Sequence, residues 1–477
     1  MGISLNPSAI LNGQGIDVSS LVQQILSESD GQLTQWQNEQ TTLQTQASDL
    51  TGINSDLSNL ATAVEALSDP LGALAAQAAT SSDTSVLTAT AQTSAVAGTH
   101  QIVVSNLATA GLVYTNDFSG GASASFLPSN TTSGEIDLQV GGSGGTTHQI
   151  MITAGSNDTL NTLASYINSQ NWGVRASVVT DATGARLALA SQATGSPGAL
   201  AITNNTTNLA FNPPTGGTNA SLTIDEIPYS STSNTITGAI AGVTLNLAGA
   251  APNSTVELTV GPDTQTVTDT INNFVSAYNQ VMADINQQFT VDASTNSEGP
   301  LGSDSALRTL QSSLMNDVTY SLTGNSGLVN LASLGINMND DGTLTVGTTP
   351  SGQTLSQVLA ANPTAFQTFF QNSSNTGFAN NFHTDLTNLT DPTQGLLNVD
   401  LAQNNTEQQN LSDSINNFED QLQAEQKQLT SEFSAVDASL QAYPLLLQQT
   451  TETLATLDTG SSGSGNGSSS PTLTSGL

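Results

Sequence analysis

The sequence has 477 residues, with 38 Asp and Glu against 4 Lys and Arg, so the formal net charge at pH 7 is −34. A nucleic-acid binder needs clustered Lys and Arg to release counterions, and a polybasic membrane contact needs the same residues, so the composition excludes both. Cysteine is absent, which excludes disulfides, thiol catalysis and Cys-ligated metal.

The N-terminal residues carry no pattern of membrane insertion. Residues 1–15 contain no basic residue and no long apolar run, so they do not look like a cleaved secretory signal peptide. No apolar run elsewhere approaches the ~20 residues that span a bilayer. We expect residues 1–14 to be flexible, and the chain either to stay in the cytoplasm or to be exported without a cleaved signal.

A long heptad pattern follows. Asp17 is expected to cap a short helix and Asp30 a longer one, which ends at Ser68-Asp69-Pro70 because the residue before proline avoids the helical region. Apolar residues repeat every seven positions, with a second row three residues later, over about four repeats. This is the pattern of a coiled-coil seam. The predicted seam consists of Trp36, Leu43, Leu50, Ile53, Leu57, Leu60, Val64 and Leu67.

The next part of the chain is β-rich. Alternation predicts strands at 86–91 and 102–104, paired as a hairpin through a turn at Gly98. Residues 111–235 are rich in Gly, Ser, Thr and Asn and are predicted to form an inserted domain with the local order β-β-α-β-β. Asp158 is expected to cap its helix. The apolar face of that helix carries Leu160, Leu163, Ala164 and Ile167.

A return segment begins with a strand at 242–247. Two further helices are expected near 304–321 and 355–371, and Asn362-Pro363 should break or cap the second. Before them lies an amphipathic helix with six apolar residues on one stripe. The stripe consists of Val267, Ile271, Phe274, Tyr278, Val281 and Ile285.

The C-terminal helix, 405–457, repeats the heptad pattern of the first. Pro444 is expected to kink or restart it, and the Ser/Gly-rich residues 458–477 are expected to be disordered. Two amphipathic helices in an ordinary globular core are the alternative, but four heptads without a breaker favour a coiled-coil stem. The predicted row and its flanking positions are Leu411, Ile415, Phe418, Leu422, Leu429, Phe433, Val436, Leu440, Tyr443 and Leu447.

Motifs that superficially suggest chemistry have simpler interpretations. Residues 141–145 fit G-x-S-x-G, but a strand follows where a nucleophile elbow needs a helix. Residues 337–342 resemble the start of a calcium loop, but Thr348 occupies the position of the bidentate acid, so a hairpin is expected. The three histidines lie far apart in sequence, at His100, His148 and His383. We therefore predict no catalytic residue, no cofactor, no metal site and no enzyme.

Charge predicts how the two terminal helices hold together. Residues 28–69 contain seven acids and no base, and residues 405–458 contain nine acids and one base, Lys427. Interhelical salt bridges are therefore almost unavailable, and attraction must come from the apolar seam. Crowded carboxylates should have raised pKa values, so stability should fall as pH rises through them. Asp17 and Asp30, at helix N-termini, should have lowered pKa values.

Several segments together resemble one known family. They are G-I-D-V-S-S-L-V at 15–22, S-S-D-T-S-V-L-T-A-T-A at 81–91, G-V-T-L at 242–245, G-P-L-G-S-D at 299–304, L-G-I at 334–336, D-G-T-L at 341–344 and G-L-L at 395–397. Their order is similar to that in the flagellar hook-associated protein 2, or FliD, family of filament caps. The β-β-α-β-β unit resembles the flagellin and hook IN motif, with Ile167-Asn168 as its namesake pair.

The resemblance implies an α+β fold, with a terminal helical coiled-coil stem or leg and inserted β-rich head domains, as in flagellin-like axial proteins. Residues 15–70 and 405–457 would form the stem. Residues 71–110 and 236–404 would form a mixed β/helical domain that completes the leg and inner head. Residues 111–235 would form the inserted head domain.

The resemblance also implies a function. The chain would form a ring-shaped homo-oligomer, pentamer-like, at the extracellular tip of the bacterial flagellum, after type III export. It would promote flagellin folding and insertion and prevent flagellin leakage. Implied partners are other copies of the chain, flagellin, hook–filament junction proteins and a cytoplasmic export chaperone at the C-terminal helix. The alternatives are another axial protein, such as a junction protein or flagellin-like protein, or a surface adhesin that uses the β head for cell adhesion.

Overall fold

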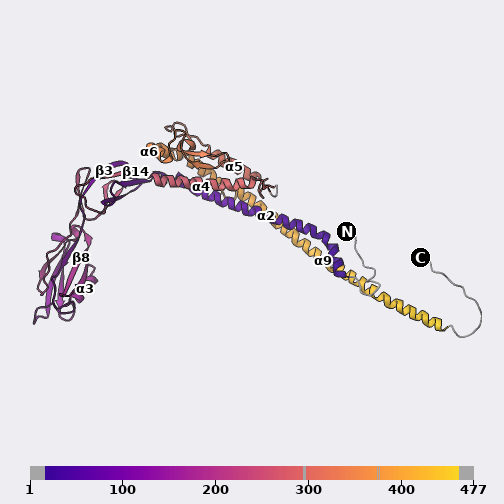
Figure 1. The fold of residues 1–477 in the computed structure, drawn as a ribbon, viewed down its shortest axis with the longest axis horizontal. Coiled ribbons are helices and arrows are strands. Elements are labelled where there is room, and N and C mark those ends of the chain that lie inside the picture. The colour runs from indigo at the N-terminus through magenta and orange to yellow at the C-terminus, as the bar shows by residue number, and fades with distance from the viewer. Residues whose placement is uncertain (1–16, 294–296, 373, 375, 461–477) are drawn as a thin grey trace, which may run out of the picture. The chain divides into compact units, whose positions relative to one another are not determined.

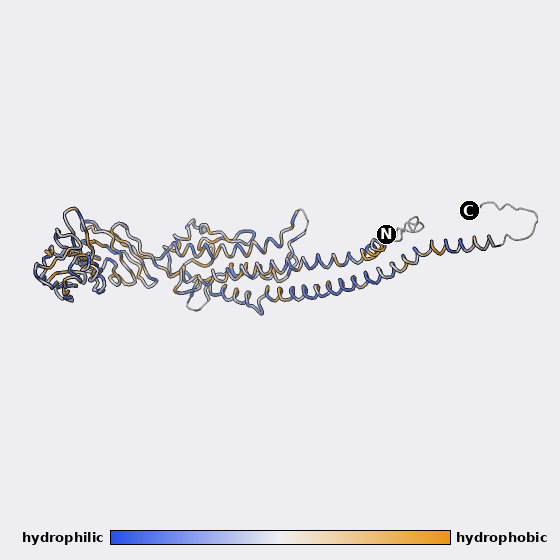
Figure 2. The backbone as a smooth tube through the Cα atoms, turned by 90° about the horizontal axis from the view of Figure 1, so that it is seen from below, coloured by the Kyte–Doolittle hydropathy of each residue, from blue (hydrophilic) through white to orange (hydrophobic). Residues whose placement is uncertain are grey.

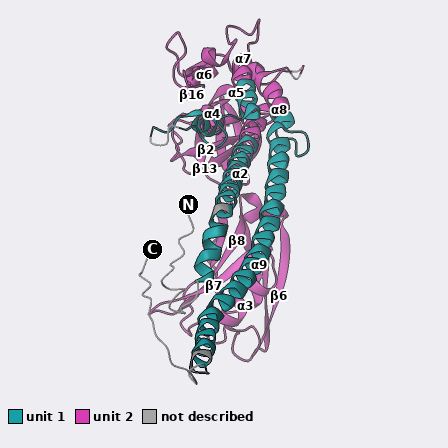
Figure 3. Ribbon diagram, turned by 90° about the vertical axis from the view of Figure 1, so that its right-hand side faces the viewer, with its two compact units in different colours: residues 1–59, 280–314, 386–477 teal, residues 60–279, 315–385 magenta. Residues whose placement is uncertain are grey.

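The computed structural model describes residues 17–293, 297–372, 374 and 376–460. The segments expected to be flexible or disordered, 1–14 and most of 458–477, lie outside this range. The chain divides into two compact units, which are coloured separately in Figure 3. Unit 1 comprises residues 1–59, 280–314 and 386–477, and unit 2 comprises residues 60–279 and 315–385. With 46% helix and 24% strand, the predicted α+β class is confirmed.

The first long helix, α2 (Val18–Ser68), is continuous. Asp17 caps it as predicted, because Asp17 Oδ1 accepts a hydrogen bond from the Ser20 N–H at 3.1 Å. Asp30 lies inside α2, so the prediction that it caps a second helix is wrong. Gly31 is the only weak helix former beside it and costs about 1 kcal/mol, which a helix of this length tolerates. The predicted end before Pro70 is confirmed.

The last helix, α9 (Leu396–Gly460), starts earlier than predicted and runs through Pro444 without a restart. Proline removes one N–H and crowds the preceding turn, at a cost of about 3 kcal/mol. The helix nevertheless continues on both sides of Pro444, so its other turns offset that cost. Short apolar stretches recur along α9 between polar ones (Figure 2).

Four helices of the return segment lie where helices were predicted, and one helix was missed. The apolar stripe of α4 (Thr264–Phe289) is fully buried. The helix α5 (Ser305–Val318) follows, and Pro363 separates α6 (Leu355–Ala361) from α7 (Pro363–Phe370), as predicted. The helix missed from sequence is α8 (Phe378–Leu389), which packs Phe378 against the Phe274 ring at 5.7 Å.

Two sheets share one aliphatic core in unit 2. Figure 1 labels β3 (Gly98–Asn106) and β14 (Val256–Pro262) of the first sheet. Both predicted strands exist, as β2 (Leu87–Ala91) and β3, but the predicted hairpin between them is wrong. The strand β2 pairs with β13 (Val243–Leu247), whereas β3 pairs with β14 and β10 (Ala220–Ile224). The first sheet has the order β1 (Gln77–Ser81), β14 (Val256–Pro262), β3 (Gly98–Asn106), β10 (Ala220–Ile224), β11 (Ile227–Ser231). The second has the order β12 (Thr235–Ile240), β13 (Val243–Leu247), β2 (Leu87–Ala91).

Two edge strands of these sheets are poor templates for further pairing. Pro228 lies in β11, at the edge of the first sheet, and has no N–H to offer. The edge strand β12 carries a register shift between Thr237 and Ile240, with Gly238 at φ 80°. Both features are devices that protect sheet edges.

The inserted domain has the predicted β-β-α-β-β order, built around its own core. Thr159, and not Asp158, caps its helix, since the Thr159 side chain accepts from the Thr162 N–H. Asn168, of the namesake pair, bonds both the N–H and the C=O of Ala176 at 2.8 Å and so fastens the helix to a strand. The elements are β4 (Ala110–Tyr114), β5 (Ser133–Val140), β6 (Thr146–Thr153), α3 (Leu160–Ser169), β7 (Val174–Thr180), β8 (Ala185–Thr194) and β9 (Leu200–Asn205).

The two motifs that superficially suggested chemistry are turns. Residues 141–145 connect β5 to β6. These strands pair antiparallel, with Val140 opposite Thr146 next to the connection, so residues 141–145 form a hairpin turn. Residues 339–343 connect β15 (Ile336–Met338) to β16 (Leu344–Val346), also as predicted. In that turn Asp341 Oδ1 accepts a hydrogen bond from the Thr343 N–H at 3.0 Å.

Candidate assembly site

The helices α2 and α9 lie side by side and antiparallel within unit 1. Each step toward the C-terminus of α2 is matched by a step back along α9, and most of the joining groups are amides. The contacts are Trp36 with Phe418 (ring centroids 5.4 Å apart), Gln408 Nε2 to the Leu43 carbonyl (3.3 Å), Asn404 Nδ2 to Gln46 Oε1 (3.3 Å) and Asn54 Nδ2 to Asn398 Oδ1 (3.2 Å).

This register limits how far the two predicted rows can face each other. The α2 end of the seam, from Leu60 to Leu67, lies past the point where α9 begins, although its apolar residues are fully buried. At the other end, Val18 would stand opposite the stretch just before Val436. The structure therefore brings together the middle of the two rows, and coiled-coil pairing over their whole length stays a prediction.

The burial of the predicted residues follows the same division. On α2, Trp36 and Leu43 are half-buried, whereas the remainder of the row is buried: Leu50, Ile53, Leu57, Leu60, Val64 and Leu67. On α9, Ile415 is buried and the half-buried residues are Leu411, Phe418, Leu422, Leu429, Phe433 and Leu440. The α9 residues beyond the start of α2 are exposed: Val436 (47%), Tyr443 (65%) and Leu447 (56%).

The exposed part of α9 is an apolar row on a helix that α2 does not reach. Leu445, Leu446 and Leu454 add to it, at 58–72% exposure. Contiguous exposed apolar side chains mark surfaces that other molecules cover. We call residues 436–454 the distal row.

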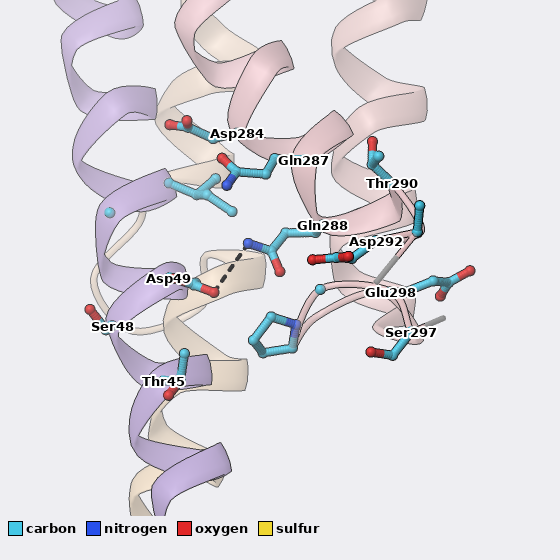
Figure 4. Close-up of a pocket in the computed structure, with 15 residues that line it drawn as sticks. Thr45, Ser48, Asp49, Asp284, Gln287, Gln288, Thr290, Asp292, Ser297 and Glu298 are labelled. Carbon is cyan, nitrogen blue, oxygen red and sulfur yellow. Dashed lines mark hydrogen bonds between the residues drawn. The ribbon is translucent and has the colours of Figure 1, made fainter. Parts of the chain in front are cut away.

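A tight loop holds α2, α4 and α5 together on the other side of α2. Figure 4 shows the cavity beside it, about 720 Å³, with Asp49 from α2 and Gln288 from α4 pointing toward each other. The Gln288 side chain is 8% exposed; its Nε2 donates to Asp49 Oδ2 at 3.1 Å and its Oε1 accepts from the Leu301 N–H at 3.1 Å. Gln46 adds a bond to the Pro300 carbonyl at 2.8 Å.

The G-P-L-G-S-D segment forms that loop, and its residue types follow from the packing. A Cβ on Gly299 would lie 2.6 Å from Gln288 Oε1, and one on Gly302 would lie 2.4 Å from the Glu298 Cβ, so both positions need glycine. Asp304 then caps α5, accepting from the Ala306 N–H at 2.6 Å. This segment could be recognised from the sequence only through its resemblance to the family, since residue spacing alone does not show which side chain would crowd a Cβ.

The side chains that line the cavity include several carboxylates and amides. In the part of the chain that the structure describes, no three His, Asp or Glu side chains are placed to hold a metal ion. His100 pairs with Asp225 at 2.7 Å and His148 stacks on Trp172 at 4.5 Å. No described helix is both long enough and apolar enough to cross a membrane.

Crowded carboxylates were predicted between the two acid-rich terminal helices, but those with raised pKa values occur where other helices meet and not between α2 and α9. Burial, followed by a hydrogen bond with Asp385, raises the pKa of Asp317 to about 7. Burial, followed by a hydrogen bond with Asp304, raises the pKa of Asp400 to about 6. Asp284, beside Asp56, also has a raised pKa, chiefly through burial. The hydrogen bond from the Ser20 N–H lowers the pKa of Asp17, as predicted.

Family models match both ends of the chain and its insert. The model of the flagellar hook-associated protein 2 N-terminus matches residues 14–111, and that of its C-terminus matches residues 217–443. Between them, the flagellin hook IN motif matches residues 135–193. The order of the three matches is that of the segments quoted from the sequence.

Relatives and a solved structure agree with these matches. The B-type flagellar hook-associated protein 2 of Pseudomonas aeruginosa is 28% identical over 416 residues, covering 81% of this chain and 84% of that protein. The Escherichia coli protein is 25% identical over 346 residues, covering 68% and 72%. The crystal structure of the flagellar cap protein FliD D1-D2-D3 domains from Escherichia coli superposes with a TM-score of 0.55 at 25% identity, covering 75% of this chain and 99% of that one. The chain belongs to the flagellar hook-associated protein 2 family.

Proposed function

We propose that this protein caps the distal end of the bacterial flagellar filament, where it promotes flagellin folding and insertion and prevents flagellin from leaking. The observation that carries this is the match of both family models, over residues 14–111 and 217–443, with a fold shared with a flagellar cap protein. An axial protein of another kind would share the IN motif at 135–193 without both flanking matches. The role is structural and not catalytic.

We assign the domains the roles in a cap that the resemblance implied. The paired helices α2 and α9 form the leg, and the β-rich insert belongs to the head that faces incoming flagellin. Copies assemble as a ring, pentamer-like, outside the cell at the flagellum tip after type III export. Hook–filament junction proteins are its first neighbours when the filament starts.

The contacts within the leg suit a cap that is repositioned each time a subunit is added. The α2–α9 contact described above relies on one aromatic pair and several neutral amide bonds, each worth about 1 kcal/mol. Many weak contacts can be exchanged singly, whereas a few strong ones cannot. The distal row of α9 provides the surface for a partner, which is the export chaperone before export and the filament after it.

A deletion strain tests the proposal. Cells without this protein should keep hooks, lack filaments and release monomeric flagellin into the medium, and the full chain should restore filaments. Complementation with Leu447→Asp should fail, because it puts a charge in the distal row, whereas Gln448→Asp, on the neighbouring exposed position, should succeed. Normal filaments without the protein would refute capping. Equal success of both variants would refute only the role of the distal row.

A further inference from the structure

Three pairs of Asp side chains lie close enough, where helices meet, for one carboxyl to raise the pKa of the other. In each pair, a hydrogen bond between the two carboxyl groups is the second cause of a raised pKa, after burial. Two ionised carboxylates could not form that bond, because both only accept, so the bond would need a proton on one of them. The pairs are Asp317 of α5 with Asp385 of α8, Asp400 of α9 with Asp304 at the start of α5, and Asp284 of α4 with Asp56 of α2.

The surroundings leave these pairs without a basic partner. Asp317 Oδ2 and Asp400 Oδ2 are buried and accept no hydrogen bond from the residues that the structure describes. Within the same residues, no Lys or Arg forms an ion pair with any of the six carboxylates. Arg308 directs its guanidinium to the Gly302 carbonyl at 2.8 Å and to the Phe289 ring.

The other titratable groups at the pairs either stay neutral or add negative charge. Asp317 and Asp385 line a cavity of about 330 Å³ together with Tyr320. Burial raises the pKa of Tyr320 and, more strongly, that of Tyr278, which also feels the charge of Asp317. Near Asp400 the added charge is Glu407, and near Asp284 it is Asp49. Each of these two acids makes the shared proton harder to remove.

We propose that the helices of this protein are fastened by protons shared within the three carboxyl pairs, so that the fold is firmest in mildly acidic medium and loosens toward neutral pH. The composition supports the same conclusion independently. Lowering the pH removes the charges behind a net −34 and leaves at most four Lys and Arg and three His charged. Acid therefore relieves self-repulsion here without replacing it by a strong positive charge.

The direction of the pH dependence follows from the two kinds of shift. The pKa values of Asp317 (about 7) and Asp400 (about 6) lie above the ordinary value of 3.8, so their stabilisation is complete below that value and is lost as pH rises through 6 to 7. Capping and turn acids such as Asp17, Asp341 and Asp391 have lowered pKa values, so their stabilisation is lost below pH 3.8. Stability should therefore peak between about pH 4 and 5.

Thermal unfolding of the full chain, followed by helix signal at constant ionic strength, tests this. The wild-type Tm should be highest between pH 4 and 5 and lower at pH 7. Asp317→Asn should raise the Tm at pH 7 and flatten the profile between pH 5 and 7, since an amide donates the bond without needing a shared proton. Asp385→Asn makes the same change from the other helix. Asp340→Asn removes one charge from an exposed turn and should leave the slope of the wild type.

Each result of this experiment either supports or overturns the proposal. A wild-type Tm that is constant or rises from pH 5 to 7 overturns the proposal, as does a slope in Asp317→Asn and Asp385→Asn equal to that of Asp340→Asn. Failure of both pair variants to fold at pH 5 also overturns it, because the amide should replace the protonated carboxyl there. A flattened profile in either pair variant, with an unchanged slope in the control, supports it.

Discussion

Single buried amides join elements that are far apart in this sequence. Gln288 illustrates this, since its one side chain bonds an Asp49 carboxylate on α2 and the Leu301 N–H of the G-P-L-G-S-D loop. An amide can donate and accept at the same time, which a carboxylate or an amine cannot do. In a chain almost without Lys and Arg, Gln and Asn take the joining role that ion pairs would otherwise share.

Replacing Gln288 tests that role. Gln288→Ala should lower the free energy of unfolding by about 1–3 kcal/mol, because it leaves the buried Leu301 N–H without an acceptor. Gln287→Ala, at the neighbouring exposed position, should change it by less than about 0.5 kcal/mol. Urea unfolding of both variants provides the measurement, and equal losses would contradict the role of Gln288.

At the residue scale, local rules predicted some positions and failed at others for clear reasons. Asp17 was predicted as a cap because its carboxylate can accept a free first-turn N–H, and it does accept the Ser20 N–H. Asp30 satisfied the same rule but lies inside α2, where continuation of the helix outweighs a local cap. Thr159 caps α3 in place of the predicted Asp158, since residue type alone does not decide between adjacent candidates.

At the element scale, the helices with long apolar periodicity were predictable and the pairing of strands was not. The stripe of α4 fixed both its type and its buried face. The connection between β2 and β3 instead crosses from one sheet to another, which local alternation cannot reveal. The helix α8 was missed although Phe378, Phe382 and Leu386 recur every four residues, a spacing that would have identified it.

The buried part of α2 is the element on which the proposed leg depends. Leu57→Asp should destabilise unit 1 by about 3–5 kcal/mol, because Leu57 is fully buried and the new carboxylate has no basic partner. Motility should be lost while the β-rich insert stays folded. Ser55→Asp, on the exposed face two residues away, should retain motility. Motility assays with limited proteolysis of the insert would show the difference, and normal swimming of Leu57→Asp would contradict the leg.

At the scale of the whole molecule, charge governs how the fold responds to its medium. A net charge of −34 repels itself, and added salt screens that repulsion. Raising NaCl from about 20 mM to 500 mM, a change from weak to strong screening, should raise the Tm at pH 7 and have a smaller effect at pH 4, where most carboxylates are neutral. Calorimetry at the two pH values checks this, with pH 4 as the internal control. A Tm at pH 7 that falls with salt would contradict it.

The family could be recognised from sequence because its motifs occur in a fixed order along the chain. The geometry at the helix contacts could not be predicted from the sequence. The carboxyl groups that meet are determined by how α4, α5, α8 and α9 pack. The crowded acids were predicted along α2 and α9 because both helices are rich in Asp and Glu. The structure places the meeting points where other helices cross them, as with Asp56 and Asp400.

The protected sheet edges have a consequence for crowding. Proline in β11 and the irregular register of β12 deny an approaching chain the row of main-chain groups that it would need to extend either sheet. In the ring that we propose, copies of the chain would otherwise risk pairing edge to edge through these strands. At these two edges, contacts through side chains are therefore favoured over main-chain pairing with a neighbour.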